Sequence, residues 1–148
     1  MSDDPLYDLI WMSRPLMQAA EAAVERGLVG TGLTVRMRAV LEILAAQGDL
    51  PVPDLAARLE IQRQYVQVMV NETLAAGLTR RVPNPRHARS PLIALTHEGR
   101  RLIESVMAAE ARLIAQIGTG IDAGDAARAL EVVRLLTERL KTLGKDTA

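Results

Sequence analysis

The sequence predicts a mainly α-helical fold with one small β-hairpin and a helical dimerisation region, and three observations support this. Apolar residues recur at three- and four-residue steps over most of the chain. Between residues 78 and 95 this period gives way to two short extended runs around a Pro-rich segment. Glycines and prolines separate the periodic segments. With 148 residues, 49% of them apolar, the chain is long enough for one domain with its own core.

The N-terminal segment has the pattern of an amphipathic helix. Apolar residues between Leu6 and Val24 repeat at helical spacing, and glycines at 27, 30 and 32 end the pattern. Pro15 lies inside the segment, and a proline in a helix interior removes a hydrogen bond and clashes with the preceding turn. We therefore expect Pro15 to kink this helix or to divide it.

Three shorter helices are predicted in the first half of the remaining chain. The first runs from about Thr34 to Gln47 and ends at Gly48. A second opens at Pro53-Asp54, because proline suits the first turn of a helix and an acidic residue stabilises its positive end. A third covers roughly residues 63 to 76 and ends at Gly77.

The segment that follows is predicted to be a β-hairpin. Residues 78–82 and 92–95 are the two extended runs, and residues 83–91 connect them. This loop contains Pro83, Pro85 and Pro91, so it is too rich in proline to be helical and too long for a tight turn.

Two long helices are predicted to complete the chain. Thr96 can cap the first of them, which spans about 20 residues. After Gly118, Gly120 and Gly124, the last helix carries an apolar stripe that covers much of its circumference. A helix of this kind needs more than one neighbour, and a second copy of the chain is the simplest one. The sequence therefore predicts a homodimer.

Charge is distributed unevenly along the chain. The formal net charge is zero, yet the segment from Ile61 to Pro91, here called the basic segment, holds five arginines and one glutamate, a net of +4. The rest of the chain carries a net of −4. A chance fluctuation on a solvated surface is one interpretation. An anionic partner for the basic segment, such as DNA, is the other.

The order of helix, short turn, helix and basic hairpin is that of a winged helix-turn-helix. The major groove of DNA, about 12 Å wide, admits one helix. A Pro- and Arg-rich hairpin beside that helix can enter the adjacent minor groove. Ala56 is small enough to let the two helices approach closely, while Leu59 and Ile61 flank the turn between them. Residues 63–76 are then the recognition helix.

Over residues 33 to about 100 the sequence resembles the multiple-antibiotic-resistance regulator (MarR) family. The matching residues are Leu33-Thr34, Val40-Leu41, Asp54-Leu55-Ala56, Leu59, Gly77-Leu78, Arg81, Asn84-Pro85, Arg89, Leu95-Thr96 and Gly99. The resemblance implies a single MarR-like domain over residues 1–148. Residues 33–96 would bind DNA, while residues 1–32 and 97–148 would form the dimerisation region. It also implies a palindromic operator and, in many members, release by a small aromatic or lipophilic effector.

Four residues depart from the family pattern. Glu60 stands where the turn usually has Gly, and a left-handed backbone there would cost roughly 1 kcal/mol. Gln62 replaces the usual Ser or Thr cap of the recognition helix. Val68 stands where many members have a polar or basic residue. His87 occupies the position of an Asp that commonly braces the wing arginine. These departures bear on operator sequence and affinity rather than on the fold.

The recognition helix presents a polar face opposite its apolar one. We expect Gln64 and Gln67 to read bases, because glutamine can pair with adenine through two hydrogen bonds, and Arg63 to contact phosphate or guanine. Asn71 lies on the same face. Ordinary polar surface residues are the alternative interpretation. The candidate DNA-binding residues are Arg63, Gln64, Tyr65, Gln67, Val68, Asn71, Arg86, His87 and Arg89.

Some of these candidates have more specific expectations. Tyr65 and Val68 lie at the margins of the polar face, where Val68 can meet a thymine methyl group and Tyr65 can pack inside instead. Arg86 and Arg89 are assigned to the wing and the minor groove, with the alternative that they are solvated surface residues.

One face of the first helix is a candidate effector site. Tyr7, Trp11 and Arg14 are spaced at i, i+4 and i+7, so they could line a cleft between the dimerisation and DNA-binding regions, with Arg14 facing a carboxylate. A packing or dimer-surface role is the alternative.

Nothing in the sequence indicates an enzyme, a cofactor or a metal. His87, His97 and Glu98 fit no zinc spacing, and no set of nucleophile, base and acid is evident. The chain has no cysteine, which removes disulfides and thiolate sites.

The sequence also predicts the location and the class of the protein. Residues 5–23 are interrupted by charged residues and by Pro15, so we expect no signal peptide, no membrane span and a cytoplasmic location. We predict a DNA-binding transcriptional regulator, with repression as the first interpretation and activation as the open alternative. A winged-helix protein-interaction module is the alternative.

Overall fold

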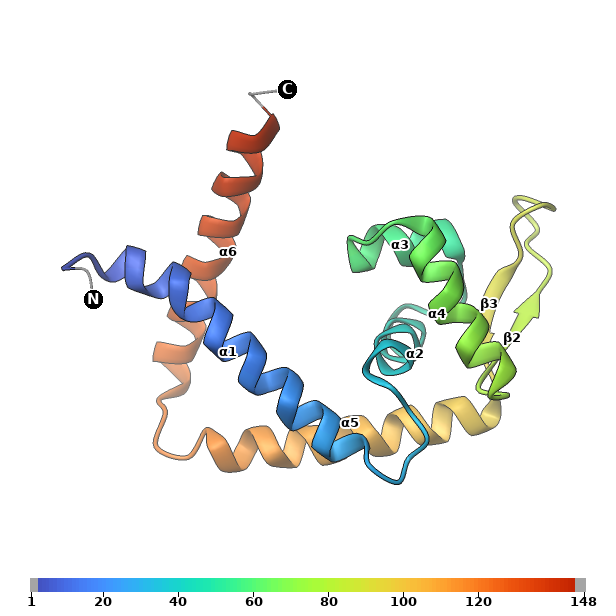
Figure 1. Ribbon diagram of the computed structural model, residues 1–148, viewed down its shortest axis with the longest axis horizontal. Helices are drawn as coiled ribbons and strands as arrows, with labels where there is room; N and C mark the ends of the chain where they lie inside the picture. The colour runs from blue at the N-terminus through green and yellow to red at the C-terminus, as the bar shows by residue number, and fades with distance from the viewer. Residues whose placement is uncertain (1–2, 146–148) are drawn as a thin grey trace. The chain divides into compact units, whose positions relative to one another are not determined.

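The computed structural model describes residues 3–145, which form six helices and three short strands (Figure 1). The chain divides into two compact units. One unit is formed by residues 19–112, and the other combines residues 3–18 with residues 113–145. The predicted class, mainly helical with a small β-hairpin, is confirmed. No helix in the described part of the chain is long and apolar enough to cross a membrane.

The three central helices lie where the sequence predicts them. Helix α2 (Val35–Gln47) begins at Thr34, whose hydroxyl accepts a 3.1 Å hydrogen bond from the backbone N–H of Met37, and it ends at Gly48. Helix α3 spans Val52–Leu59 and helix α4 spans Arg63–Ala75. The end of α2 needs glycine, because Gly48 has a φ of 85°.

The hairpin belongs to a three-stranded antiparallel sheet. Strands β2 (Thr79–Val82) and β3 (Leu92–Leu95) pair over their full length, and Figure 1 shows the loop that extends beyond them. Strand β1 (Leu50–Pro51) pairs with the other edge of β3, giving the order β1-β3-β2. Strand β1 is not predicted from the sequence, because two residues ending in proline show no alternation from which a strand could be inferred.

Two groups of buried apolar side chains form the core of the unit of residues 19–112. One joins α2, α3 and α4 to β3, with Val40, Leu55, Val66 and Val70 fully buried. The other joins the end of α1, α2 and the first half of helix α5 (His97–Ile117). These contacts bury the apolar side of α4, so its other side is left exposed.

The hairpin is attached closely to the start of α5. Thr96 caps this helix as predicted, because its hydroxyl accepts a 3.0 Å hydrogen bond from the N–H of Gly99. The same hydroxyl donates to the carbonyl of Gly77 at 2.8 Å. A Cβ on residue 99 would lie 1.9 Å from the carbonyl oxygen of Leu78, so only glycine fits there.

Helices α2 and α5 are also joined by an ion-pair network. The guanidinium of Arg38 donates through two nitrogens to the carboxylate of Glu110 and through a third, at 2.6 Å, to Glu42. The pKa of Arg38 is raised, first by its hydrogen bonds to Glu110 and then, against a desolvation penalty, by Glu42. A two-pronged, half-buried pair of this kind holds α5 in a defined orientation on α2.

The terminal helices are long. Helix α1 (Pro5–Leu28) runs without a break through Pro15, so the expectation that proline divides it is wrong. The surrounding residues are exposed, so water can satisfy the carbonyl that loses its partner. Helix α6 (Ala123–Lys145) has no buried residue within its described length. Its exposed large apolar residues are Leu130, Val132, Val133, Leu135, Leu140 and Leu143.

Candidate nucleic-acid interface

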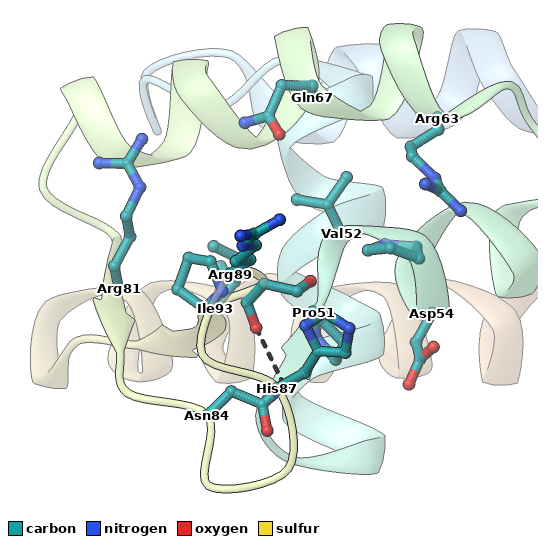
Figure 2. Close-up of a pocket in the computed structure, with 13 residues that line it drawn as sticks. Pro51, Val52, Asp54, Arg63, Gln67, Arg81, Asn84, His87, Arg89 and Ile93 are labelled. Carbon is teal, nitrogen blue, oxygen red and sulfur yellow. Dashed lines mark hydrogen bonds between the residues drawn. The ribbon is translucent and has the colours of Figure 1, made fainter.

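A cleft of about 560 Å³ lies between α3, α4 and the wing, which is here the β2–β3 hairpin with its loop of residues 83–91. Figure 2 shows Arg63 and Gln67 entering it from α4, with Asn84 and His87 on the opposite side in the wing loop. The lining residues are Pro51, Val52, Pro53, Asp54, Arg63, Gln67, Arg81, Asn84, His87, Arg89, Ser90, Pro91 and Ile93. The cleft therefore brings together four of the predicted DNA-binding residues from two separate elements.

The cleft is rich in positive charge. Arg63, Arg81 and Arg89 line it from α4, β2 and the wing loop. Asp54, at the start of α3, is the one carboxylate among the lining residues. A surface with this balance attracts anions such as DNA phosphates.

The two sides of α4 differ as the sequence predicts. Val66, Met69 and Val70 are at most 2% exposed, and they anchor the helix in the core. The remaining candidates on α4 are all exposed: Arg63, Gln64, Tyr65, Gln67, Val68 and Asn71. Four of these six, Gln64, Tyr65, Val68 and Asn71, lie outside the lining of the cleft. The exposed side of α4 is thus a mainly polar surface next to the cleft, interrupted by Val68.

The turn before α4 is held in an unusual backbone conformation. Glu60 has φ 56° and ψ 40°, the left-handed region, and among the described residues it is the one non-glycine with a positive φ. The N–H groups of Glu60 and Ile61 both donate to the carbonyl of Ala56, which closes the end of α3. Gln62 precedes α4 without capping it through its side chain. The two departures from the family pattern in this turn are therefore visible in the structure. Glu60 has the left-handed backbone that usually favours glycine, and Gln62 leaves the start of α4 without a side-chain cap.

Asn84 organises the wing loop. Its side-chain N–H donates to the carbonyl of Ser90 at 2.9 Å, and its side-chain oxygen accepts from the backbone N–H of Arg86 at 3.0 Å. The backbone N–H of His87 donates to the carbonyl of Asn84 at 3.3 Å. The side chains of Arg86, His87 and Arg89 remain exposed. The loop thus has a defined shape, while its basic side chains can face a partner.

The one acidic residue of the basic segment is neutralised by a cation from another helix. Arg36, in the first turn of α2, donates to one oxygen of Glu72 at 2.9 Å. The other oxygen of Glu72 is buried and has no hydrogen-bond partner within residues 3–145. The pKa of Arg36 is raised, first by a hydrogen bond with Tyr65 and then by the charge of Glu72. Tyr65, which is 48% exposed, therefore points toward α2 rather than into the core.

Some residues of this surface were not assigned a role by the sequence analysis. Arg81 is predicted only as a match to the family pattern, Asp54 as such a match and as the start of a helix, and no role is predicted for Arg36. Arg36 lies outside the basic segment, and its partners Tyr65 and Glu72 are far from it in the sequence. For Arg81 a signal existed, because it belongs to the basic segment.

The candidate effector residues lie on one face of α1. The rings of Tyr7 and Trp11 are in contact, with centroids 6.1 Å apart and planes inclined by 58°. Both are 54% exposed, and Arg14 is exposed as well. Their role in binding an effector stays a prediction. Within the described residues, no group of three or more His, Asp or Glu side chains is arranged to hold a metal ion.

Comparison with known sequences identifies relatives over the central part of the chain. Residues 31–90 match the model of the MarR family. An uncharacterised protein of Mycobacterium tuberculosis is 39% identical over 67 residues, which are 44% of this chain and 47% of that protein. The matching region thus spans about half the length of the curated relatives.

Solved structures extend the similarity to almost the whole chain. The crystal structure of a MarR family transcription regulator is 36% identical, with a TM-score of 0.86, covering 95% of this chain and 93% of that one. The structure of CouR from Rhodococcus jostii RHA1, bound to p-coumaroyl-CoA, is 26% identical with a TM-score of 0.79. That similarity covers 91% of this chain and 95% of CouR. The likeness therefore includes the terminal helices as well as the winged helix-turn-helix.

Proposed function

The chain belongs to the MarR family of transcription regulators, and we propose that it binds a palindromic DNA operator as a homodimer and represses the genes under that operator. The family consists of regulators and not of enzymes. The observation that carries the proposal is that Arg63, Arg81 and Arg89 all line one cleft beside the exposed side of α4. In this proposal α4 enters the major groove, and the wing reaches the adjacent minor groove.

The apolar surface of α6 supports the proposed dimer. Leu130, Leu140 and Leu143 are each about half exposed or more in the single chain, and full burial of such a side chain contributes about 1.5–3 kcal/mol. A second copy that covers these residues would remove the apolar stripe from water. In a symmetric dimer the two α4 helices would lie about one DNA turn apart, which matches a palindromic operator.

Release by a small aromatic or lipophilic effector is the further part of the proposal. Its support is the CouR structure, in which a relative holds p-coumaroyl-CoA, together with the exposed pair of Tyr7 and Trp11 on α1. An effector that releases DNA must bind the free protein more tightly than the DNA-bound protein, by the same factor as it weakens DNA binding.

The DNA proposal is tested by comparing two variants over a range of salt concentrations, using the DNA upstream of the protein's own gene. Arg89→Ala should weaken binding to all sequences. It should also lower the magnitude of the slope of log K against log salt by roughly 0.9 for each phosphate contact that is lost. A dimer carries two copies of Arg89 and would lose two such contacts. Gln67→Ala should change the slope little and relax the base preference at one position in each half-site.

A matched control variant separates the loss of one positive charge from the loss of a contact in the cleft. Arg101→Ala removes the same charge from an exposed position of α5 outside the cleft, so it should leave the slope nearly unchanged. If Arg89→Ala binds like the parent protein at low salt, the cleft is not the DNA surface. A winged-helix module that binds another protein would then be the better interpretation.

A further inference from the structure

Two polar side chains on the exposed side of α4 are hydrogen-bonded to each other. The amide nitrogen Nε2 of Gln67 donates to the side-chain oxygen Oδ1 of Asn71 at 2.9 Å. The residues are four apart, the spacing at which side chains meet on a helix surface. Gln67 also lines the cleft, and Figure 2 shows its amide extending from α4 toward the wing.

This bond leaves Gln67 with a defined set of free hydrogen-bonding atoms. A glutamine amide has two N–H donors and one carbonyl acceptor. Because one N–H is bonded to Asn71, one N–H donor and the acceptor Oε1 remain free for a base. In the major groove adenine offers the complementary pair, the N7 acceptor and the N6 donor, whereas guanine offers two acceptors at N7 and O6. The free atoms of Gln67 therefore match adenine, and its Oε1 would face O6 of guanine unfavourably.

We propose that Asn71 is a positioning residue that fixes the Gln67 amide so that Gln67 selects adenine over guanine in each half-site. Asn71 itself reads no base. This inference rests on the proposed function, since it concerns how the same surface chooses its operator. Without Asn71, the amide of Gln67 could turn and present its N–H groups to guanine.

The chain contains an internal comparison. Gln64 lies on the same side of α4, but the residue four positions later is Val68, whose side chain has no hydrogen-bonding atom. Gln64 should therefore discriminate adenine from guanine less sharply than Gln67 does. The two glutamines differ in this respect because of their neighbours, although the helix presents both of them to solvent.

The test measures the affinity of the full-length protein for operators in which each A·T pair is replaced in turn by G·C. Asn71→Leu removes the acceptor, and we expect it to lower the preference for adenine about five-fold at one position of each half-site. Asn71→Asp keeps an acceptor oxygen, so it should retain that preference although its charge weakens binding to every sequence. Gln67→Ala should abolish the preference at the same position, and adding Asn71→Leu to it should change nothing further.

Three results would overturn the inference in a parent protein that binds its operator selectively. A change of preference at a different base pair in Asn71→Leu would mean that Asn71 reads a base itself. An unchanged preference in that variant would mean that the hydrogen bond does not orient Gln67. Loss of the preference in Asn71→Asp would mean that Asn71 donates rather than accepts.

Failure of the proposed function gives a different result. A parent protein that shows no operator selectivity at all refutes that function, and the inference falls with it. Folding is not at risk in the Asn71→Leu variant, because Asn71 is exposed and leucine is the better helix former. A thermal unfolding curve for each variant confirms this.

Discussion

Replacing Glu60 by glycine should stabilise the protein, although it removes a whole side chain. Glu60 connects α3 to α4 in the left-handed region, at φ 56° and ψ 40°. An L-residue pays about 1–2 kcal/mol for this conformation because its Cβ approaches the following carbonyl oxygen. Glycine avoids that cost but loses about 0.5–1 kcal/mol more chain entropy on folding. The difference favours Glu60→Gly by about 1 kcal/mol per chain.

The expected gain is large enough to measure. For a chain of this length, a gain of about 1 kcal/mol corresponds to a rise in Tm of about 3 °C. Unfolding by heat and by urea should be compared at one fixed chain concentration, because the stability of a dimer depends on concentration. Glu60→Asn should lie between the parent and the glycine variant, because asparagine tolerates the left-handed region better than most residues do.

Glu60→Ala is the control that separates backbone from side chain. Alanine removes the interactions of the Glu60 carboxylate but keeps the Cβ, so it should be no more stable than the parent. If alanine stabilises as much as glycine, the gain comes from removing the carboxylate and the backbone explanation is wrong. A glycine variant less stable than the parent would refute the reasoning altogether.

Two further predictions concern the dimer and the effector. Removing residues from Asp125 onward should give aggregated or unfolded protein, and a well-folded monomer in analytical ultracentrifugation would contradict the proposed dimer. Titration with aromatic acids, phenols or p-coumaroyl-CoA should change the fluorescence of the single tryptophan, at position 11, and weaken DNA binding. If neither the fluorescence nor the DNA affinity changes, this face of α1 is not the effector site.

The helices could be predicted from the sequence because their signals are local. Thr34 and Thr96 begin α2 and α5 with the hydrogen bonds that their hydroxyl groups predict. Gly48 and Gly77 follow α2 and α4 with positive φ. Strand β1 could not be predicted in this way, since it exists only because β3 offers it a partner. A long-range pairing of two residues leaves no periodic pattern.

The candidate site could be predicted only where its residues follow a local pattern. The exposed side of α4 follows from the spacing of Val66, Met69 and Val70, which is a local pattern. The contact of Arg36 with Glu72 joins residues 36 positions apart, and nothing in either segment indicates it. The bond between Gln67 and Asn71 has a helical spacing, but many polar pairs share that spacing without being bonded. Only the arrangement of side chains in space distinguishes such pairs.

Three departures from local sequence rules lie in or next to α4, and they bear on the function of this helix. Glu60 is strained, Gln62 does not cap the helix that it precedes, and Val68 is an apolar residue that is 53% exposed. Three arginines also line the cleft beside this helix. Elsewhere, as at Thr34, the local signals agree with the structure. Because proteins tolerate such costs where a site needs them, these departures support the proposal that the α4 surface is a binding site.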